Sequence, residues 1–276
     1  MGKELFKNIP SKVGDLVKDV RNGRIGLPDL QRPFVWKDNK VRELFDSMLK
    51  GYPIGYIMLW ESPSDYESKK STIGQNAKTY EEPKELVIDG QQRLTALVAA
   101  MFAVKVKDKN FADREIKISY NPLTREFAVW SQAYERDPEW ISRISDVFLA
   151  KEDNSISSLR RRFIKEANEG RSKKELPLLT DEEEDRIEDN INALLNLSDY
   201  SLPTLEISYT ADEEALQMAC ELQLIVFDSS RGCYGTPYRY RSHFALSLEE
   251  TLLHCGITAS KSTEYIQFKS VRNSKE

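Results

Sequence analysis

The stretch from Leu86 to Met101 constrains the fold more than any other part of the sequence. Residues 86–88 form a short apolar run typical of a buried strand, and apolar residues then recur at helical spacing, at Leu94, Leu97, Val98 and Met101. Between them lies the polar turn Asp89-Gly90-Gln91-Gln92-Arg93. Because glycine tolerates a positive φ, we predict that the strand ends at this turn and that a helix begins near Gln91.

This turn has the composition of an anion-binding site. The first N–H groups of a helix lack internal acceptors, and the helix dipole favours negative charge beside them. Arg93 adds a permanent charge that can hold a phosphate through two hydrogen bonds, and Asp89 can hold a metal ion. A structural alternative fits the same spacing, in which Asp89 only caps the helix and Arg93 is a solvated side chain.

Composition excludes a membrane-spanning protein. The chain has 276 residues, 40% of them hydrophobic, which is enough for one large core or two modest ones. No run approaches the roughly 20 apolar residues of a membrane span, and the N-terminus lacks a hydrophobic signal segment. We therefore expect a cytoplasmic protein with no membrane partner.

Charge and cysteine content point to no further ligand class. The net charge of -5 creates no global basic field, so contact with nucleic acid requires a local patch. The cysteines are Cys220, Cys233 and Cys255, and the histidines are His243 and His254. Zinc ligands normally come in pairs two to four residues apart, and these residues do not show that spacing. The spacing therefore argues against a metal cluster of Cys233, His243, His254 and Cys255.

The first hundred residues alternate helices with short strands. Ser11 is expected to cap an amphipathic helix that Gly23 ends, and residues 40–50 show the clearest helical period. Residues 51–55 read as a turn, 56–60 as a buried strand and 61–84 as a surface loop. In residues 27–36 two prolines exclude helix, Gln31-Arg32 suits a phosphate or base edge, and Phe34 and Trp36 are expected to pack on the core.

The second half is mostly helical. A hairpin is expected over residues 116–129, helices from Pro138 to Tyr200, a strand over 204–208 and a helix over 211–222. Trp140 and Ile141 are assigned to one helical face with Ile144, Val147 and Phe148. The basic stretch from Arg160 to Lys174 is diluted by glutamates, so a solvated face is favoured over contact with nucleic acid.

Three segments resemble the motifs of one known family in order and spacing. They are Leu27-Pro28-Asp29-Leu30-Gln31-Arg32-Pro33-Phe34-Val35-Trp36, Gly51-Tyr52-Pro53-Ile54-Gly55 and Ile88-Asp89-Gly90-Gln91-Gln92-Arg93-Leu94-Thr95. Over roughly residues 10–225 the chain resembles the N-terminal domain of GmrSD-type modification-dependent restriction enzymes, the DGQQR domain. That family looks like a distant relative of the ParB and sulfiredoxin fold.

The resemblance implies an α+β fold, in which a ParB/sulfiredoxin-like small mixed sheet with helices is followed by a mostly helical segment. By this resemblance the chain divides into a nucleotide-binding core over residues 10–135, a helical extension over 136–225 and an atypical tail over 226–276.

The resemblance also implies a nucleoside triphosphate and Mg²⁺ as cofactors, and DNA as a partner. Carried over, Asp89, Gln91 and Gln92 would be catalytic, with Asp89 also the metal ligand. Gly90, Arg93, Thr95, Gln31 and Arg32 would bind the nucleotide. Either glutamine could orient water for attack on the terminal phosphate, or merely satisfy the turn.

Two departures from the family pattern matter. Its nuclease chemistry belongs to a separate C-terminal domain with a His-Asn-His type site, which two late histidines cannot build, so we expect no DNA cleavage by this chain alone. A separate nuclease subunit or a missing C-terminal domain would supply it. The family's Phe-x-Arg-x-Asn-x-x-Gly segment is replaced by Met218-Ala219-Cys220-Glu221-Leu222-Gln223, which suggests a truncated or frame-shifted tail.

The main hypothesis is an NTP-binding, NTP-hydrolysing regulatory domain of a restriction and phage-defence system. One alternative is a non-enzymatic ParB-like DNA-binding module in which Arg32, Arg93 and the basic stretch contact phosphates. Another is a truncated, inactive remnant.

Overall fold

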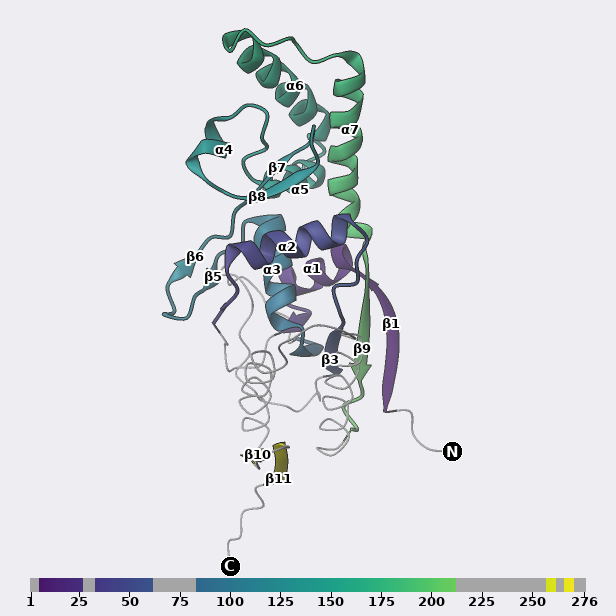
Figure 1. The fold of residues 1–276 in the computed structure, drawn as a ribbon. Helices are drawn as coiled ribbons and strands as arrows, with labels where there is room; N and C mark the ends of the chain where they lie inside the picture. Colours follow the sequence, from purple (N-terminus) through teal and green to yellow (C-terminus); the bar gives the residue numbers. More distant parts are fainter. Residues whose placement is uncertain (1–4, 27–32, 62–82, 212–256, 262–265, 271–276) are drawn as a thin grey trace, which may run out of the picture.

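The described residues form a mixed α+β fold, which confirms the predicted class. The computed structural model describes residues 5–26, 33–61, 83–211, 257–261 and 266–270 (Figure 1). The helices are α1 (Val13–Arg21), α2 (Asp38–Leu49), α3 (Gln91–Phe102), α4 (Gln132–Arg136), α5 (Ile144–Glu152), α6 (Ile156–Lys173) and α7 (Asp181–Leu195), with the 3-10 turn η1 (Asn196–Asp199). The strands are β1 (Phe6–Lys12), β2 (Ile25–Gly26), β3 (Ile57–Glu61), β4 (Glu85–Asp89), β5 (Val106–Lys107), β6 (Asp113–Arg114), β7 (Ile118–Asn121), β8 (Glu126–Val129), β9 (Ser201–Ile207), β10 (Ile257–Lys261) and β11 (Ile266–Ser270).

The central sheet is mixed and draws on both ends of the domain. Its order is β1-β9-β3-β4-β2. Strand β9 runs antiparallel to β1 and parallel to β3, while β4 runs antiparallel to β3 and parallel to β2. Because β9 belongs to the predicted extension of residues 136–225, that extension returns a strand into the sheet of the predicted core.

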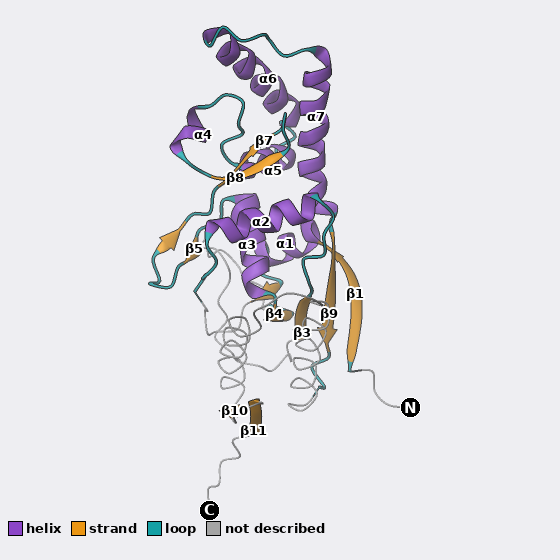
Figure 2. Ribbon diagram, in the orientation of Figure 1, coloured by secondary structure: helices purple, strands orange, loops and turns teal. Residues whose placement is uncertain are grey.

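The helices α1, α2 and α3 share one hydrophobic core with the sheet (Figure 2). The sheet contributes Ile57, Leu59 and Val87 to this core. Helix α3 is buried all round from Leu94 to Met101, whereas the sequence predicted a single apolar stripe. The reason is tertiary, since α1, α2 and α5 all contact α3, and its alanines allow close approach.

The β7–β8 hairpin and α7 are joined by buried hydrogen bonds. Tyr120 of β7 is 0% exposed, and its hydroxyl donates to the Asn190 carbonyl of α7 (3.1 Å). Asn190 donates through its side chain to the Pro122 carbonyl (2.7 Å). The predicted acidic first turn of α7 is present, and Thr180 with Glu183 forms a capping box before it.

Two local predictions are wrong, and two elements were not predicted. Ser11 lies in β1 and does not cap α1, which begins at Val13 with Lys12 as the N-cap. Strand β1 escaped prediction because its residues are mostly exposed and show no apolar alternation. Trp140 and Ile141 precede α5, and Ile141 instead forms a β-bridge with Tyr120. The β5–β6 ribbon also went unpredicted, since each strand has two residues.

Several predictions lie outside the described residues. These concern Gln31 and Arg32, most of the 61–84 loop, the helix expected over 211–222, all the cysteines and histidines, and the 226–276 tail except the β10–β11 backbone. Within the part of the chain that is described, no helix combines the length and apolar composition needed to cross a membrane.

Candidate functional site

The predicted strand, turn and helix are present at the Asp89–Arg93 turn. Strand β4 ends at Asp89, Gly90 is the N-cap with φ of +88°, and α3 begins at Gln91. Asp89 is therefore not the helix cap, which removes one half of the structural alternative. The N-cap of α3 makes no side-chain hydrogen bond, and no described backbone carbonyl accepts from the amides of residues 91–93. The first helical bond is from Leu94 to the Gly90 carbonyl (2.9 Å), so three N–H groups can meet an anion.

Gly90 is required by its surroundings as well as by its φ. A Cβ at this position would lie 2.5 Å from Ile57 Cδ1 and 3.0 Å from the Tyr56 carbonyl oxygen. The turn therefore packs directly against the entry to β3, which couples the Asp89–Arg93 turn to the preceding Gly51–Gly55 motif.

Arg93 makes the closest contact between these two motifs. Its Nη1 donates to the Tyr56 carbonyl (2.5 Å), and a Cβ on Gly55, whose φ is +95°, would lie 2.8 Å from Nη2. Burial lowers the pKa of Arg93 from its ordinary value, and Asp89 and then Tyr200 oppose that shift. Arg93 is thus a half-buried, partly desolvated cation, with Asp89 close enough to act on its charge.

Gln92 binds the third motif. Its Oε1 accepts from the Val35 amide (2.9 Å) and its Nε2 donates to the Pro33 carbonyl (3.2 Å). The Asp89–Arg93 turn therefore touches both other motifs, through Arg93 and through Gln92. Phe34, between the two Gln92 contacts, is 3% exposed, as predicted for a core side chain, and Trp36 also packs against the core.

We expect Gln92→Ala to lower the free energy of unfolding by about 2 kcal/mol, since two hydrogen bonds of about 1 kcal/mol each are lost. The neighbouring Gln91 makes no hydrogen bond to another described residue, so Gln91→Ala should change stability by less than about 0.5 kcal/mol. Urea unfolding of both variants measures the difference. Equal losses would show that the Gln92 contacts do not stabilise the fold.

The other predicted site residues lie in different environments. Gln91 is half-buried in the first turn of α3 and is the glutamine whose amide is not used by described groups. Thr95 is 7% exposed, so its side chain faces the interior more than solvent. Gln31 and Arg32 lie just before the described Pro33.

Among the residues that the structure describes, Asp89 has no cluster of metal-ligating side chains around it. Over the described ranges, no three His, Cys, Asp or Glu side chains gather as a ligand set. Mg²⁺ commonly binds one or two carboxylates together with substrate phosphates and water.

Sequence reasoning missed Tyr200 and Gly55. The Tyr200 hydroxyl donates to the Tyr52 carbonyl (2.6 Å), and this tyrosine acts electrostatically on Arg93. Burial raises the pKa of Tyr200. No local pattern marks Tyr200, because it reaches the site only through the path of the chain into β9. Gly55 lay inside a quoted motif, and the glycine itself, which allows the positive φ observed here, was the available signal.

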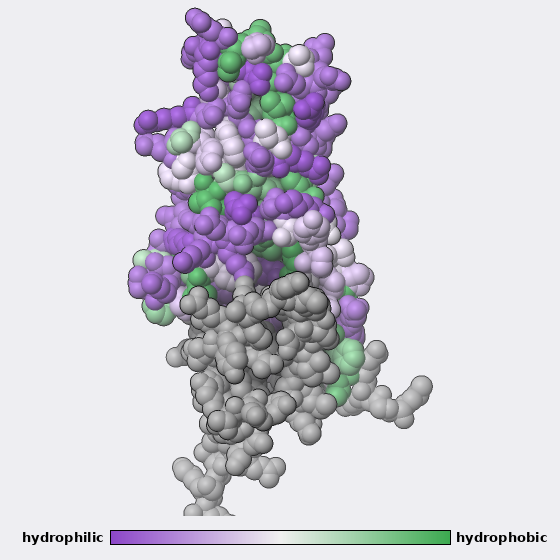
Figure 3. All heavy atoms as spheres, in the orientation of Figure 1, coloured by the Kyte–Doolittle hydropathy of each residue, from purple (hydrophilic) through white to green (hydrophobic). Residues whose placement is uncertain are grey.

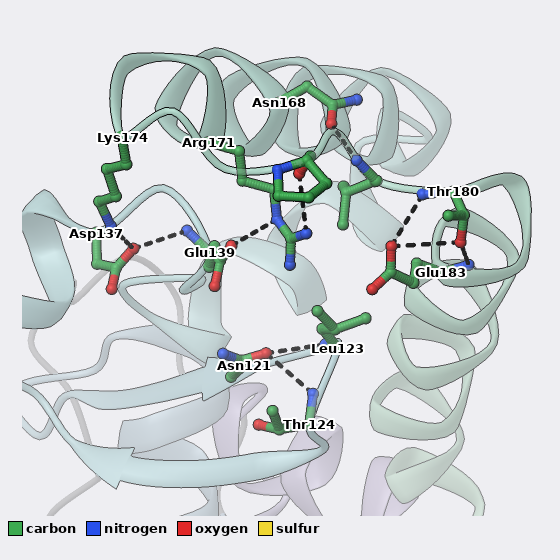
Figure 4. Close-up of polar contacts among 12 residues, drawn as sticks. Asn121, Leu123, Thr124, Asp137, Glu139, Asn168, Arg171, Lys174, Thr180 and Glu183 are labelled. Atoms are coloured by element: carbon green, nitrogen blue, oxygen red, sulfur yellow. Dashed lines mark hydrogen bonds and ion pairs between the residues drawn. The ribbon is translucent and has the colours of Figure 1, made fainter.

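The basic stretch on α6 is held largely by internal contacts. Arg171 pairs with Glu139 (2.7 Å) and Lys174 with Asp137 (3.7 Å), as Figure 4 shows. Arg160 donates to Asn192, while Arg162 and Lys165 pair with glutamates one turn away. These internal contacts support a solvated face for the basic stretch rather than contact with nucleic acid. Figure 3 shows a largely hydrophilic surface over α6 and α7.

Two comparisons with known proteins bear on the site. The family described as the GmrSD restriction endonuclease, N-terminal domain, matches residues 13–226, which include the entire Asp89–Arg93 turn. An uncharacterized protein of Methanocaldococcus jannaschii is 37% identical over 103 residues, covering 35% of this chain. The matched region is 18% of that protein, so the chain spans a small part of its length.

Proposed function

The chain belongs to the family of GmrSD restriction endonuclease N-terminal domains, and we propose that it is the nucleotide-binding, NTP-hydrolysing regulatory domain of a DNA restriction system. Its role is to couple nucleotide to the recognition of modified or invading DNA and to license a nuclease. DNA cleavage is assigned to a separate subunit or a C-terminal domain.

The observation that carries this proposal is the state of Arg93. The side chain is half-buried, and its one hydrogen bond to a described residue is to the Tyr56 carbonyl. A guanidinium has five donors, and a buried charge is costly unless it is paired. The open amides of residues 91–93 lie on the same turn. A polyphosphate would satisfy both groups, so the residues present fit a nucleotide.

Each residue then has a distinct task. The backbone amides and Arg93 neutralise the phosphate charge, and Gln91 orients water at the terminal phosphate. Gln92 is a positioning residue, because the Pro33 and Val35 backbone already occupies its amide. Asp89 would hold the Mg²⁺ ion, which shields phosphate charge when bound.

Phosphate release from each common NTP, with and without DNA, tests the proposal on the natural chain and on Asp89→Ala. Mg²⁺-dependent release is expected from the natural chain, and about tenfold less from the variant, because phosphates and water supply the other metal ligands. A nucleotide at 100 times its dissociation constant should also stabilise the natural chain by about 2.7 kcal/mol. Absence of both release and stabilisation would refute the proposal, and equal release would refute the role of Asp89.

A further inference from the structure

The β5–β6 ribbon, residues 105–114, takes no part in the function described above. In Figure 1 it projects sideways from the helices around α2 and α3. Its turn is well organised, since the Phe111 amide donates to the Asp108 carbonyl (2.8 Å). The Asp108 carboxylate accepts from the amides of Asn110 (2.8 Å) and Ala112 (3.0 Å). The ribbon therefore presents its tip in one defined conformation.

An aromatic residue occupies the tip at an energetic cost. Phe111 has φ of +58° and is 62% exposed. The left-handed region normally takes glycine, asparagine or aspartate, and a bulky residue there is an outlier. Because the ring is largely exposed, it buries little apolar area and stabilises the core little. The fold itself thus gains little from phenylalanine at this position.

The ribbon is locally basic in an acidic chain. It contains Lys105, Lys107, Lys109 and Arg114 against two aspartates, while the whole chain carries a net charge of -5. Asp113 is paired with Lys107 (2.7 Å), and the Asp108 carboxylate is used by the turn. Lys105 and Lys109 are exposed and form no ion pair with any described side chain. They differ in this from Lys165 on α6, which has a glutamate partner.

We propose that this ribbon is a contact element for duplex DNA. Phe111 packs against bases, and Lys105 and Lys109 contact the flanking phosphates. A two-stranded ribbon fits the major groove, where an apolar side chain such as phenylalanine can contact thymine methyl groups while cations contact the phosphates. The proposal rests on the proposed role in DNA restriction, but not on nucleotide hydrolysis.

The base of the ribbon is connected to the Asp89–Arg93 turn. The Phe34 amide donates to the Lys107 carbonyl (2.7 Å), and Arg114 donates to the Trp36 carbonyl (2.9 Å). Gln92 holds Pro33 and Val35 on either side of Phe34. The short segment 33–36 thus contacts both the ribbon and the Asp89–Arg93 turn. It provides the physical connection through which DNA binding at the ribbon can affect the nucleotide site.

The test is binding of a fluorescein-labelled duplex by anisotropy, with the natural chain and three variants. Phe111→Asn should weaken binding about tenfold, because the apolar contact of the ring with the bases is lost. Asparagine tolerates a positive φ, so this variant should unfold at the same or higher urea concentration. Lys105→Ala with Lys109→Ala should weaken binding and lower the salt slope by about 2. The control, Lys165→Ala with Lys173→Ala on α6, removes two exposed lysines and should bind normally.

Two results would overturn the proposal: no duplex binding by the natural chain, or equal weakening by the α6 control and the ribbon variants. Phosphate release without DNA should be the same for Phe111→Asn and the natural chain. If release is absent but ribbon-dependent DNA binding persists, the nucleotide proposal fails and the DNA proposal stands.

Discussion

Replacing Gly90 by alanine is expected to lower the free energy of unfolding by about 3 kcal/mol. About half of this loss comes from forcing a residue with a Cβ into the left-handed region, where Gly90 has φ of +88°. The rest comes from the collision of that Cβ with Ile57 Cδ1, which would be 2.5 Å away, because a close-packed core cannot relax fully. Urea unfolding followed by circular dichroism measures the loss.

Gly51 provides a matched control for this substitution. It follows α2 with φ of +72°, but a Cβ there would meet nothing within 4 Å. Gly51→Ala should therefore cost only the conformational part, about 1.5 kcal/mol. Losses of the same size at both positions would contradict the close packing of the Asp89–Arg93 turn against Ile57.

Replacing Arg93 by lysine is expected to reduce phosphate release by about 10²- to 10³-fold, the range found when one donor to a developing anion is removed. Lysine retains the positive charge and can still donate to the Tyr56 carbonyl, but it lacks the planar fork that holds a phosphate bidentately. The stabilisation by added nucleotide should fall in parallel. Steady-state phosphate release and nucleotide-dependent unfolding are the two measurements.

Arg161→Lys on α6 is the control for the arginine substitution. Arg161 is exposed and contacts only the Ser157 carbonyl of its own helix among described groups (3.3 Å), so release should be unchanged. If Arg93→Lys also retained full release, Arg93 would have only the structural role of joining the Asp89–Arg93 turn to the Gly55–Tyr56 backbone.

Local chemistry made part of this site predictable. The apolar run, the glycine and the helical period around residues 86–101 identified strand, turn and helix, and α3 begins at the predicted Gln91. The clear period of residues 40–50 likewise predicted α2. These features depend on backbone preferences and side-chain spacing, which neighbouring residues determine.

Contacts between distant segments were not predictable in the same way. Nothing local shows that Gln92 binds the Pro33 and Val35 backbone, or that Tyr200 approaches Arg93. The exposed strand β1 and the short β5–β6 ribbon were missed because their partners, rather than their own periods, define them. In the basic stretch of α6, the charges were visible in the sequence, but the ion pairs that they form within the protein were not.

By itself, the sequence determined the α+β class, the family, and the glycine turn that opens α3. Only the tertiary structure decided that Arg93 lies half-buried against Gly55, that backbone groups bind the Gln92 amide, and that β9 lies inside the sheet. The physical reason is that helix and turn formation depend on interactions within a few residues. Burial, and hence the electrostatic character of a side chain, depends on segments that the folded chain brings from far away.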